Sequence, residues 1–274
     1  MKRCLLKRSL LIASALFLVF CFNVQAGSRT QRQTQSAAVL TVGATPVPHA
    51  ELLNLIKDDL AAQGITLRIV EFTDYVQPNM ALISGDLDAN FFQHIPYLES
   101  NDDWSAKLVS AFGVHVEPFG LYSAKFNNIN QLPDGAIIAI PNDPTNGGRA
   151  LLLLQANGLI TLRDGAGLEA TPRDVTGNPK NFRFRELEAA LLPRSLSDVD
   201  AATINGNFAL QAGFNPVRDS LIIEGAQSPY VNIITVRRGS EQDAKITALR
   251  NALLSAKVKN YINNNYDGGV IAIF

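Results

Sequence analysis

Apolar and polar positions follow two spacings along the first part of the chain. Residues 39–43 form a short apolar run, and residues 65–69 alternate between apolar and polar side chains. Both patterns predict β-strands. Between them, leucine and isoleucine recur every three or four positions up to Gly64. This spacing predicts an amphipathic helix that ends at the glycine.

The same alternation of strands and helices continues toward the C-terminus. A predicted helix over 76–84 precedes a predicted strand over 87–91. An apolar strand over 136–140 then leads into a helix that contains residues 151–154. Apolar residues at helical spacing between 246 and 253 predict a long closing helix. Strands that alternate with helices are typical of α/β architecture with mostly parallel strands.

Residues 1–26 have the composition of an export signal. They hold four basic residues and no acidic residue, and they contain the uncharged, largely apolar run 10–22. A helix of that run reaches only about 20 Å, which is short of the ~30 Å hydrocarbon core of a bilayer. We therefore predict a cleaved signal peptide over 1–26 rather than a membrane anchor.

Two processing routes compete at this signal. The tripeptide Val24-Gln25-Ala26 has the small residues that signal peptidase requires, and cleavage after it gives a periplasmic protein that begins at Gly27. The alternative is lipid anchoring through Cys21, but the bulky Phe20 stands where lipoprotein processing needs a small side chain. The pattern favours the soluble periplasmic product. We predict that the polar residues 27–37 form a linker.

Composition narrows the functional classes. Of the 274 residues, 47% are hydrophobic and 18% are charged, which excludes an intrinsically disordered chain. Without residues 1–26 the chain keeps 20 basic and 25 acidic residues, a formal charge of −5. It therefore offers no global positive field for nucleic acid. Both cysteines, Cys4 and Cys21, lie in the predicted signal, so cleavage leaves no thiol for a disulfide, a metal or a nucleophile.

The sequence contains no recognisable catalytic machinery or cofactor motif. His49, His94 and His115 lie far apart without the spacing of metal ligands, which argues against a metal site. The segment Gly165–Ala170 matches a dinucleotide fingerprint in form, but no strand precedes it and Pro172 blocks a helix after it, so we expect a loop. A nucleophile elbow and a phosphate-binding loop are absent from the sequence. We predict no catalytic residues, no metal and no cofactor.

Three segments at predicted strand-to-helix junctions have the composition of a binding site. Residues 72–79 and 91–97 concentrate aromatic side chains, and residues 141–149 open a helix. In open α/β sheets, ligands bind where strands end and where helix N-termini present free N–H groups. We expect an anionic group at the start of the third segment's helix, near Asn146. Arg149, one turn further, can hold a carboxylate through two hydrogen bonds.

Each of these residues also has a purely structural interpretation. Tyr75, Phe92 and Tyr97 can belong to the core beside the strands, and His94 can be a structural histidine with its hydrogen bonds satisfied. Asn142 and Asp143 can merely cap a helix, and Arg149 can be a solvated surface charge. Composition and spacing alone leave both interpretations open for an exported α/β protein.

The same segments resemble the NlpA family, the methionine-binding lipoproteins that supply bacterial ABC importers. The resemblance extends from about residue 39 to the C-terminus and rests on FTDYVQPNMAL, GDLDANFFQHIPYL, PNDPTNGGRALLLLQ, NPKNF, ELEAALLPRSL and SPYVNII. It implies an α/β fold of the two-lobed periplasmic binding protein type (type II-like), with the ligand in the cleft between the lobes. The implied lobes are residues 38–118 plus 232–274, and residues 119–231.

The resemblance implies roles for seven residues, matched motif by motif. Four of them match residues that line the pocket of the ligand side chain: Tyr75, Phe92, His94 and Tyr97. Arg149 matches the arginine that binds the substrate carboxylate, and Asn205 and Asn232 match asparagines that hold the amino and carboxyl groups. If Arg149 has this role, we expect its guanidinium to be solvated in the open, ligand-free cleft. Its removal then leaves folding stability nearly unchanged.

The sequence departs from the family at two places. Phe20 breaks the lipobox ahead of Cys21. The stretch Gly206-Asn207-Phe208 stands where relatives commonly have Thr-Thr-Tyr, which bears on the wall of the pocket and on its specificity.

The resemblance implies a function without catalysis. We expect a periplasmic substrate-binding protein that captures methionine and delivers it to an ABC permease and ATPase at the inner membrane. One alternative is a binder of another amphiphilic amino acid or of a methionine-containing dipeptide. The other is an envelope protein that uses the fold as an interaction scaffold, because a fold does not fix a function.

Overall fold

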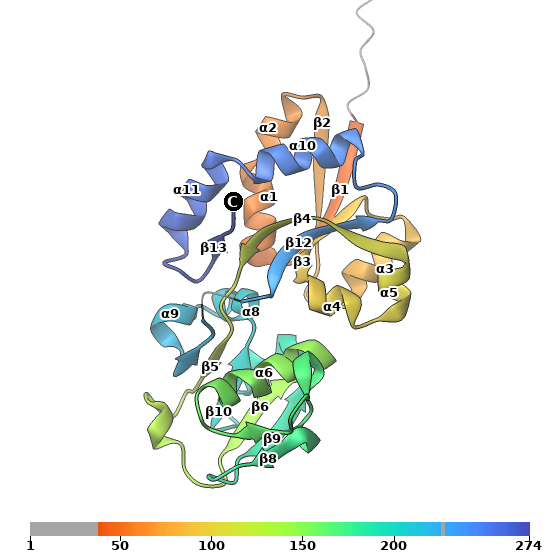
Figure 1. Ribbon diagram of the computed structural model, residues 1–274. Helices are drawn as coiled ribbons and strands as arrows, with labels where there is room; N and C mark the ends of the chain where they lie inside the picture. The colour runs from red at the N-terminus through yellow and green to blue at the C-terminus, as the bar shows by residue number, and fades with distance from the viewer. Residues whose placement is uncertain (1–37, 226–227) are drawn as a thin grey trace, which may run out of the picture. The chain divides into compact units, whose positions relative to one another are not determined.

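Two β-sheets form the framework of the protein (Figure 1). The computed structural model describes residues 38–225 and 228–274. The signal peptide predicted over 1–26 and the linker predicted over 27–37 lie outside the described residues.

The first sheet has six strands in the order β13-β4-β12-β3-β1-β2. Strand β1 pairs in parallel with β2 and β3. Strand β12 is antiparallel to both β3 and β4, and β13 is antiparallel to β4. The strands are β1 (Ala38–Ala44), β2 (Ile65–Glu71), β3 (Ala89–His94), β4 (Leu108–Val116), β12 (Val231–Arg237) and β13 (Ile271–Ala272).

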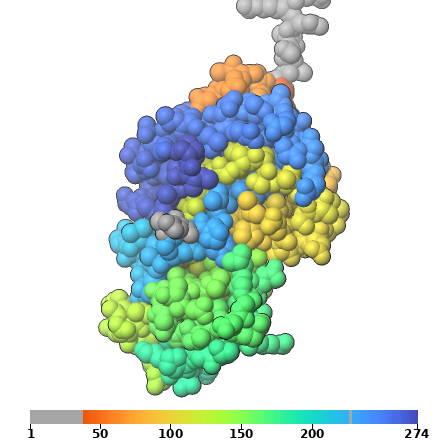
Figure 2. Space-filling model, viewed as in Figure 1, coloured from red at the N-terminus to blue at the C-terminus, as the bar shows by residue number. Residues whose placement is uncertain are grey.

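Helices cover both faces of the first sheet. Successive residues of a strand point to opposite faces, and Phe91 and Phe92 of β3 accordingly enter two different hydrophobic clusters. The cluster of Phe91 includes residues of α1 (Glu51–Leu55), α2 (Lys57–Ala61), α10 (Ala244–Leu253) and α11 (Ala256–Asn265). The cluster of Phe92 includes residues of α3 (Gln77–Ser84), α4 (Ile95–Glu99) and α5 (Asp102–Lys107). In the space-filling view the blue segment that contains α10 and α11 covers the upper part of the visible face (Figure 2).

The second sheet has five strands in the order β11-β5-β10-β6-β9. Its strands β10, β6 and β9 are parallel, whereas β5 is antiparallel to β10 and β11. The strands are β5 (Gly120–Tyr122), β6 (Ile137–Pro141), β9 (Arg183–Leu187), β10 (Ala201–Ile204) and β11 (Ile222–Ile223).

Helices also pack on both faces of the second sheet. Ile138 of β6 clusters with residues of α6 (Pro144–Ala156), and its neighbour Ala139 clusters with residues of α7 (Leu192–Ser195) and α8 (Gly206–Gln211). The remaining elements are α9 (Pro216–Asp219), the two-stranded sheet of β7 (Thr161–Leu162) and β8 (Val175–Gly177), and the short turns η1 (Pro46–Ala50), η2 (Ile129–Gln131), η3 (Gly167–Glu169), η4 (Pro172–Asp174) and η5 (Ala189–Leu191).

The hydrophobic pattern predicts the α/β architecture correctly, with local exceptions. Gly85 ends α3 in the left-handed region at φ +92°, as a helix-terminating glycine does. The expected loop at 165–170 is confirmed, because the segment holds only the short turn η3. The predicted long closing helix is wrong: the chain breaks after α10, and the Ser255 hydroxyl accepts the Val258 N–H to begin α11. A local N-cap overrides the apolar spacing there.

The expectation of mostly parallel strands is also wrong. In the first sheet β12 lies between β3 and β4 and runs antiparallel to both. The reason is the connectivity: the chain leaves this sheet after β4 and re-enters it as β12, more than a hundred residues later. Such strands are not joined by the short strand–helix–strand unit that produces parallel pairing.

Two segments connect the two sheets (Figure 1). The chain passes from β4 to β5 through residues 117–119, and it returns from β11 to β12 through residues 224–230, of which 226–227 lie outside the described residues. The predicted lobe boundaries, 38–118 plus 232–274 and 119–231, stay a prediction.

The described helices are short. The longest, α6, has 13 residues. Within 38–225 and 228–274, no helix has both the length and the apolar character needed to cross a bilayer.

Gly148 allows α6 to pack closely against the η3 turn, and this contact positions the helix that carries Asn146 and Arg149. A Cβ atom at Gly148 would lie 2.0 Å from the carbonyl oxygen of Leu168, which is backbone and cannot swing away. We expect Gly148→Ala to lower the free energy of unfolding by about 1–3 kcal/mol, the usual cost of overpacking. Denaturant titration measures it.

The control is Ala156→Gly at the exposed end of the same helix, which costs at most about 1 kcal/mol through helix propensity. Wild-type stability in Gly148→Ala would contradict the close packing of α6 on η3.

Candidate ligand-binding site

A narrow cavity lies where strand ends of the first sheet face helix starts of the second. The structure brings all seven residues of the sequence prediction into its lining: Tyr75, Phe92, His94, Tyr97, Arg149, Asn205 and Asn232. Their individual contacts with a ligand stay a prediction. Five further residues complete the lining: Gln93, Glu117, Asn146, Gly206 and Asn207.

Aromatic rings form one wall of the cavity. The ring of Tyr75 lies 5.8 Å from those of Phe92 and Tyr97 and 5.0 Å from that of Phe208, measured between centroids. The Tyr75 hydroxyl donates to Asn207 Oδ1 at 2.5 Å, and the Tyr97 hydroxyl donates to the Tyr75 carbonyl at 3.1 Å. The hydroxyls are therefore engaged within the protein, and the rings supply an apolar surface. Asn207 and Phe208 of this wall belong to the stretch 206–208, where the resemblance predicts a departure from the family.

His94 is held as a neutral donor at the edge of this wall. Its Nδ1 accepts the Tyr97 N–H at 3.1 Å, at the start of α4, so that Nε2 carries the proton and donates to Asn146 Oδ1 at 3.2 Å. Burial, together with the positive charge of Arg149, lowers the pKa of His94 to about 3. The His94–Asn146 hydrogen bond links the first sheet to the second, and Asn146 Oδ1 also accepts from Asn205 Nδ2 at 2.8 Å.

Asp143 caps the N-terminus of α6. Its side chain accepts the Asn146 N–H at 2.9 Å, and it also accepts from the Asn146 side chain. The capping interpretation of Asp143 is thereby confirmed. The anionic group expected at the start of this helix stays a prediction.

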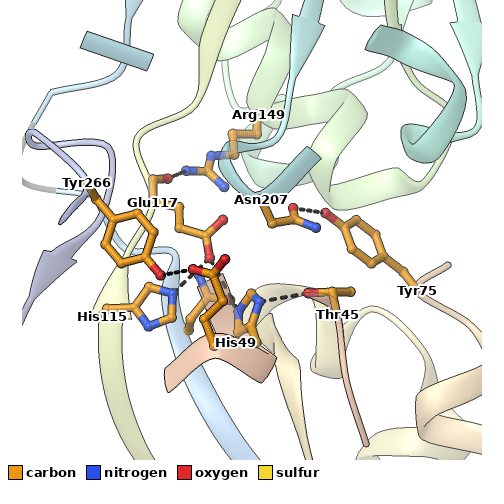
Figure 3. Close-up of polar contacts among 10 residues, drawn as sticks. Thr45, His49, Tyr75, His115, Glu117, Arg149, Asn207 and Tyr266 are labelled. Carbon is orange, nitrogen blue, oxygen red and sulfur yellow. Dashed lines mark hydrogen bonds and ion pairs between the residues drawn. The ribbon is translucent and has the colours of Figure 1, made fainter. Parts of the chain in front are cut away.

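Arg149 is buried and already paired. Its side chain donates to both carboxylate oxygens of Glu224, through Nε at 3.0 Å and through Nη2. Nη2 also donates to the Glu117 carbonyl at 3.1 Å (Figure 3). Its guanidinium carbon lies 4.0 Å from the ring centre of Tyr230 and 4.9 Å from that of Phe119. Only 4% of the surface of Arg149 is exposed. Arg149 is therefore not a solvated surface charge, and the expectation of a solvated guanidinium in an open cleft is wrong for this structure.

Two asparagines in the lining keep unused hydrogen-bonding atoms. Asn205 Oδ1 and Asn207 Nδ2 are buried without a partner among the described residues. One is an acceptor and the other a donor. Buried polar atoms of this kind are rare in proteins and are commonly satisfied by a ligand or by water.

A second polar cluster adjoins the cavity and was not apparent from the sequence. Glu117 Oε1 lies 2.8 Å from His115 Nε2 and 3.3 Å from His49 Nε2, although His49 is distant in the chain (Figure 3). His49 Nδ1 lies 2.7 Å from the Thr45 hydroxyl, and its Nε2 lies 3.0 Å from Asn232 Oδ1. No local motif marks the cluster, because η1 supplies one histidine and the end of β4 supplies the other residues.

Burial keeps both of these histidines neutral. It lowers the pKa of His49 to about 4 and that of His115 to about 3, although the negative charge of Glu117 raises the pKa of His49 in part. The neutral ring of His115 can then donate its Nε2–H to the Glu117 carboxylate, and that of His49 can donate to Asn232 Oδ1. The donor atoms of His49, His115 and Glu117 also lie within 4.8 Å of one another, which is the spacing of a possible divalent-metal site.

The fold and this cavity define a periplasmic binding protein, in which a small ligand is held between two α/β lobes. The chain belongs to the NlpA lipoprotein family, whose model matches residues 40–274.

Comparison with individual proteins agrees with the family. The chain is 47% identical over 232 residues to the membrane lipoprotein TpN32 of Treponema pallidum, covering 84% of this chain and 87% of the relative. It is 39% identical over 269 residues to the methionine-binding lipoprotein MetQ of Bacillus subtilis, covering 96% and 98%. Among solved structures it is similar to a nutrient-binding protein of Burkholderia cenocepacia bound to methionine, with a TM-score of 0.83, 45% identity and coverage of 86% and 100%.

These relatives are named as binding proteins or lipoproteins. The second term is at odds with the expectation that this chain lacks a lipid anchor, which rests on Phe20.

We expect the stability of the ligand-free protein to fall as the pH is lowered from 7.5 to 5. The chain has three histidines, all buried, whose pKa values are lowered to between about 3 and about 4. Below pH ~6.5 the unfolded chain takes up protons on histidine that the folded protein does not, so the free energy of unfolding falls, by at least ~2 kcal/mol at pH 5. The raised pKa of Glu117 offsets part of this.

Urea titrations at the two pH values measure the effect, and His115→Gln serves as the comparison. Because His115→Gln keeps only two histidines, its free energy of unfolding should fall less between pH 7.5 and pH 5 than that of the wild type. Equal or higher stability at pH 5 would show that the histidines are not buried in the neutral form.

Proposed function

We propose that this protein is a periplasmic substrate-binding protein that captures methionine and delivers it to an inner-membrane ABC importer. One observation carries the proposal. The cavity joins an aromatic wall to buried polar groups of opposite character, with Arg149 and Asn207 Nδ2 as donors, and Glu117 and Asn205 Oδ1 as acceptors. An amphiphilic zwitterion needs this combination.

The two parts of methionine suit the two parts of the cavity. A thioether is polarizable and packs well against aromatic edges, as the rings of Tyr75, Phe92 and Tyr97 provide. A buried zwitterion requires partners for both its carboxylate and its ammonium. The methionine bound to the Burkholderia cenocepacia protein, at 45% identity, supports the same ligand here.

A methionine-containing dipeptide stays the alternative within this class. An envelope scaffold is less well supported, since a scaffold does not need unpaired polar atoms buried in a cavity.

Delivery requires a change of state, which we assign to hinge closure of the lobes 38–118 plus 232–274 and 119–231 over the ligand. The hinges in this scheme are residues 117–119 on one crossing, and residues 224–225 and 228–230 on the other. The closed form then docks on an ABC permease with its ATPase.

We expect refolded, ligand-free protein to bind methionine most tightly of the twenty amino acids. Aspartate, glutamate and lysine should bind weakly, because their side-chain charges would lose hydration against the aromatic wall without gaining a partner. Calorimetric titration of the amino acids decides this. Tighter binding of a charged amino acid would contradict the proposal.

Arg149→Ala should weaken methionine binding by about 30-fold to several thousand-fold, the usual result of truncating one partner of a buried charge pair. Arg149→Lys should retain only part of the wild-type affinity for methionine, because an ammonium group cannot reproduce the two parallel hydrogen bonds of the planar guanidinium. Unlike a solvated arginine, Arg149 should also contribute about 2 kcal/mol to the stability of the ligand-free protein, because its removal leaves Glu224 unpaired.

The control is Arg194→Ala on α7, where the side chain is exposed. It should change neither affinity nor melting temperature. Unchanged methionine affinity in Arg149→Ala would remove Arg149 from the site.

We also propose that the mature protein works in the periplasm and begins at Gly27 after cleavage at Ala26. Intact-mass measurement of the protein from the envelope fraction distinguishes the two routes. A mass that carries a diacylglyceryl group on Cys21 would instead place this protein with the lipid-anchored relatives.

A further inference from the structure

We propose that His49, together with Thr45, is a positioning residue that turns the Asn232 side chain so that its amide N–H groups face the carboxylate of the ligand. The inference rests on the proposed function and deepens it, because it names residues that act on the ligand through another side chain. Neither Thr45 nor His49 belongs to the motifs that carry the family resemblance, and neither of them lines the cavity.

His49 has a fixed place beside the cavity. It belongs to η1, shortly after β1, and none of its surface is exposed. The Phe91 ring meets the imidazole edge-on at 4.6 Å between centroids, and the His115 ring lies 5.1 Å away. A fully buried ring that packs against two others keeps one orientation. Its hydrogen-bond partner Asn232, near the start of β12, does line the cavity.

The contacts of the His49 ring decide which nitrogen carries its proton. Burial lowers the pKa of His49 to about 4, so the ring is neutral at pH 7 and has a single N–H group. Nε2 faces Glu117 Oε1 at 3.3 Å, an oxygen that already accepts from His115. Because an unprotonated nitrogen would repel that oxygen, Nε2 carries the proton. Nδ1 then accepts from the Thr45 hydroxyl, which lies 2.7 Å away (Figure 3).

This arrangement of protons determines the orientation of the Asn232 amide. The side-chain atom that lies 3.0 Å from His49 Nε2 has to accept a hydrogen bond, so it is Oδ1. Among the described residues, the Nδ2 group of Asn232 has no hydrogen-bond partner, and its residue lines the cavity. Two N–H donors are therefore available to a ligand. They suit a carboxylate and not an ammonium group, which has no acceptor.

The contacts of Arg149 show why a ligand carboxylate needs such a donor. The guanidinium uses Nε and Nη2 for Glu224 and for the Glu117 carbonyl, which leaves Nη1 for a ligand. A carboxylate has two oxygens with about four acceptor sites. Nη1 alone cannot satisfy them, and a poorly paired carboxylate is costly to bury. Asn232 Nδ2 supplies the additional donors, provided that His49 keeps the amide in this orientation.

The competing interpretation is purely structural. Thr45 and His49 would then only fill the space beside Phe91, and their hydrogen bonds would stabilise the fold without affecting the ligand. This interpretation predicts that a change at His49 affects binding independently of Asn232, or not at all. A double-mutant cycle separates the two interpretations, because it measures whether one residue acts through the other.

The cycle titrates methionine by calorimetry into refolded wild type, His49→Leu, Asn232→Ala and the variant with both substitutions. Leucine keeps the space filled but removes both ring nitrogens. Each single substitution should weaken methionine binding by at least ~10-fold, the usual effect of losing a hydrogen bond to a charged group. The double variant should bind no more weakly than Asn232→Ala. Losses that multiply in the double variant, or unchanged affinity in His49→Leu, would overturn the inference.

Asn232→Asp tests the polarity of the side chain. It keeps an acceptor for His49 but turns a second oxygen toward the ligand. Methionine binding should weaken by at least ~30-fold, because two carboxylates then face each other. Methioninamide, in which a neutral amide replaces the ligand carboxylate, should lose far less. Unchanged or tighter binding of methionine would show that the side chain presents an oxygen to the ammonium group, and would overturn the inference.

Substitutions of Thr45 keep the inference testable if His49→Leu does not fold. Thr45→Val removes the hydroxyl at similar shape and should weaken methionine binding by about 3- to 10-fold, because Nδ1 loses its donor. Thr45→Ser keeps a hydroxyl and should bind as wild type does. The control is Thr41→Val in β1, which removes a buried hydroxyl outside the cavity lining and should leave affinity unchanged. Wild-type affinity in Thr45→Val would overturn the role of the hydroxyl in fixing the ring.

The outcome for wild type separates this inference from the proposed function. Wild type that binds no methionine would overturn the proposed function and the inference together. Methionine binding by wild type with multiplied losses in the cycle would overturn the inference alone. Thermal melts of the ligand-free variants establish that each affinity is measured on folded protein.

Discussion

Arg149 is buried beside two glutamates, its two-pronged partner Glu224 and the buried Glu117, and this cluster of charge is the constraint on which the site depends. The Glu117 carboxylate accepts from His115 and from the backbone N–H of Asn207, and Arg149 contacts the backbone carbonyl of Glu117. Both glutamates lie in the segments that connect the two sheets. Because a buried charge without a partner is costly, these contacts hold the charged groups of the cavity in place.

The rest of the fold fixes the geometry of this cavity. Helix α6 presents Arg149 from the second sheet and is held against η3 by the close approach at Gly148. The end of β3 presents His94 from the first sheet, and the His94–Asn146–Asn205 hydrogen bonds tie the two together. The aromatic wall around Tyr75 completes an apolar compartment beside the polar one. A small amphiphilic zwitterion fits both compartments, whereas an inorganic ion or a purely apolar ligand fits only one.

The sequence predicts the parts of this account that local patterns encode. Apolar periodicity identifies β1, α3 and α6, and the family motifs bring all seven expected residues to one cavity. The sequence does not predict the antiparallel β12 or the His49–His115–Glu117 cluster, because both depend on contacts between segments that are distant in the chain. The pairing of Arg149 with Glu224 is missed for the same reason, and with it the burial of the guanidinium.

A crystal structure of the protein with methionine tests the central claim most directly. The account predicts the thioether against the rings of Tyr75, Phe92 and Tyr97, and the ligand carboxylate beside Arg149. Methionine bound outside this cavity, or with its carboxylate turned away from Arg149, would contradict it.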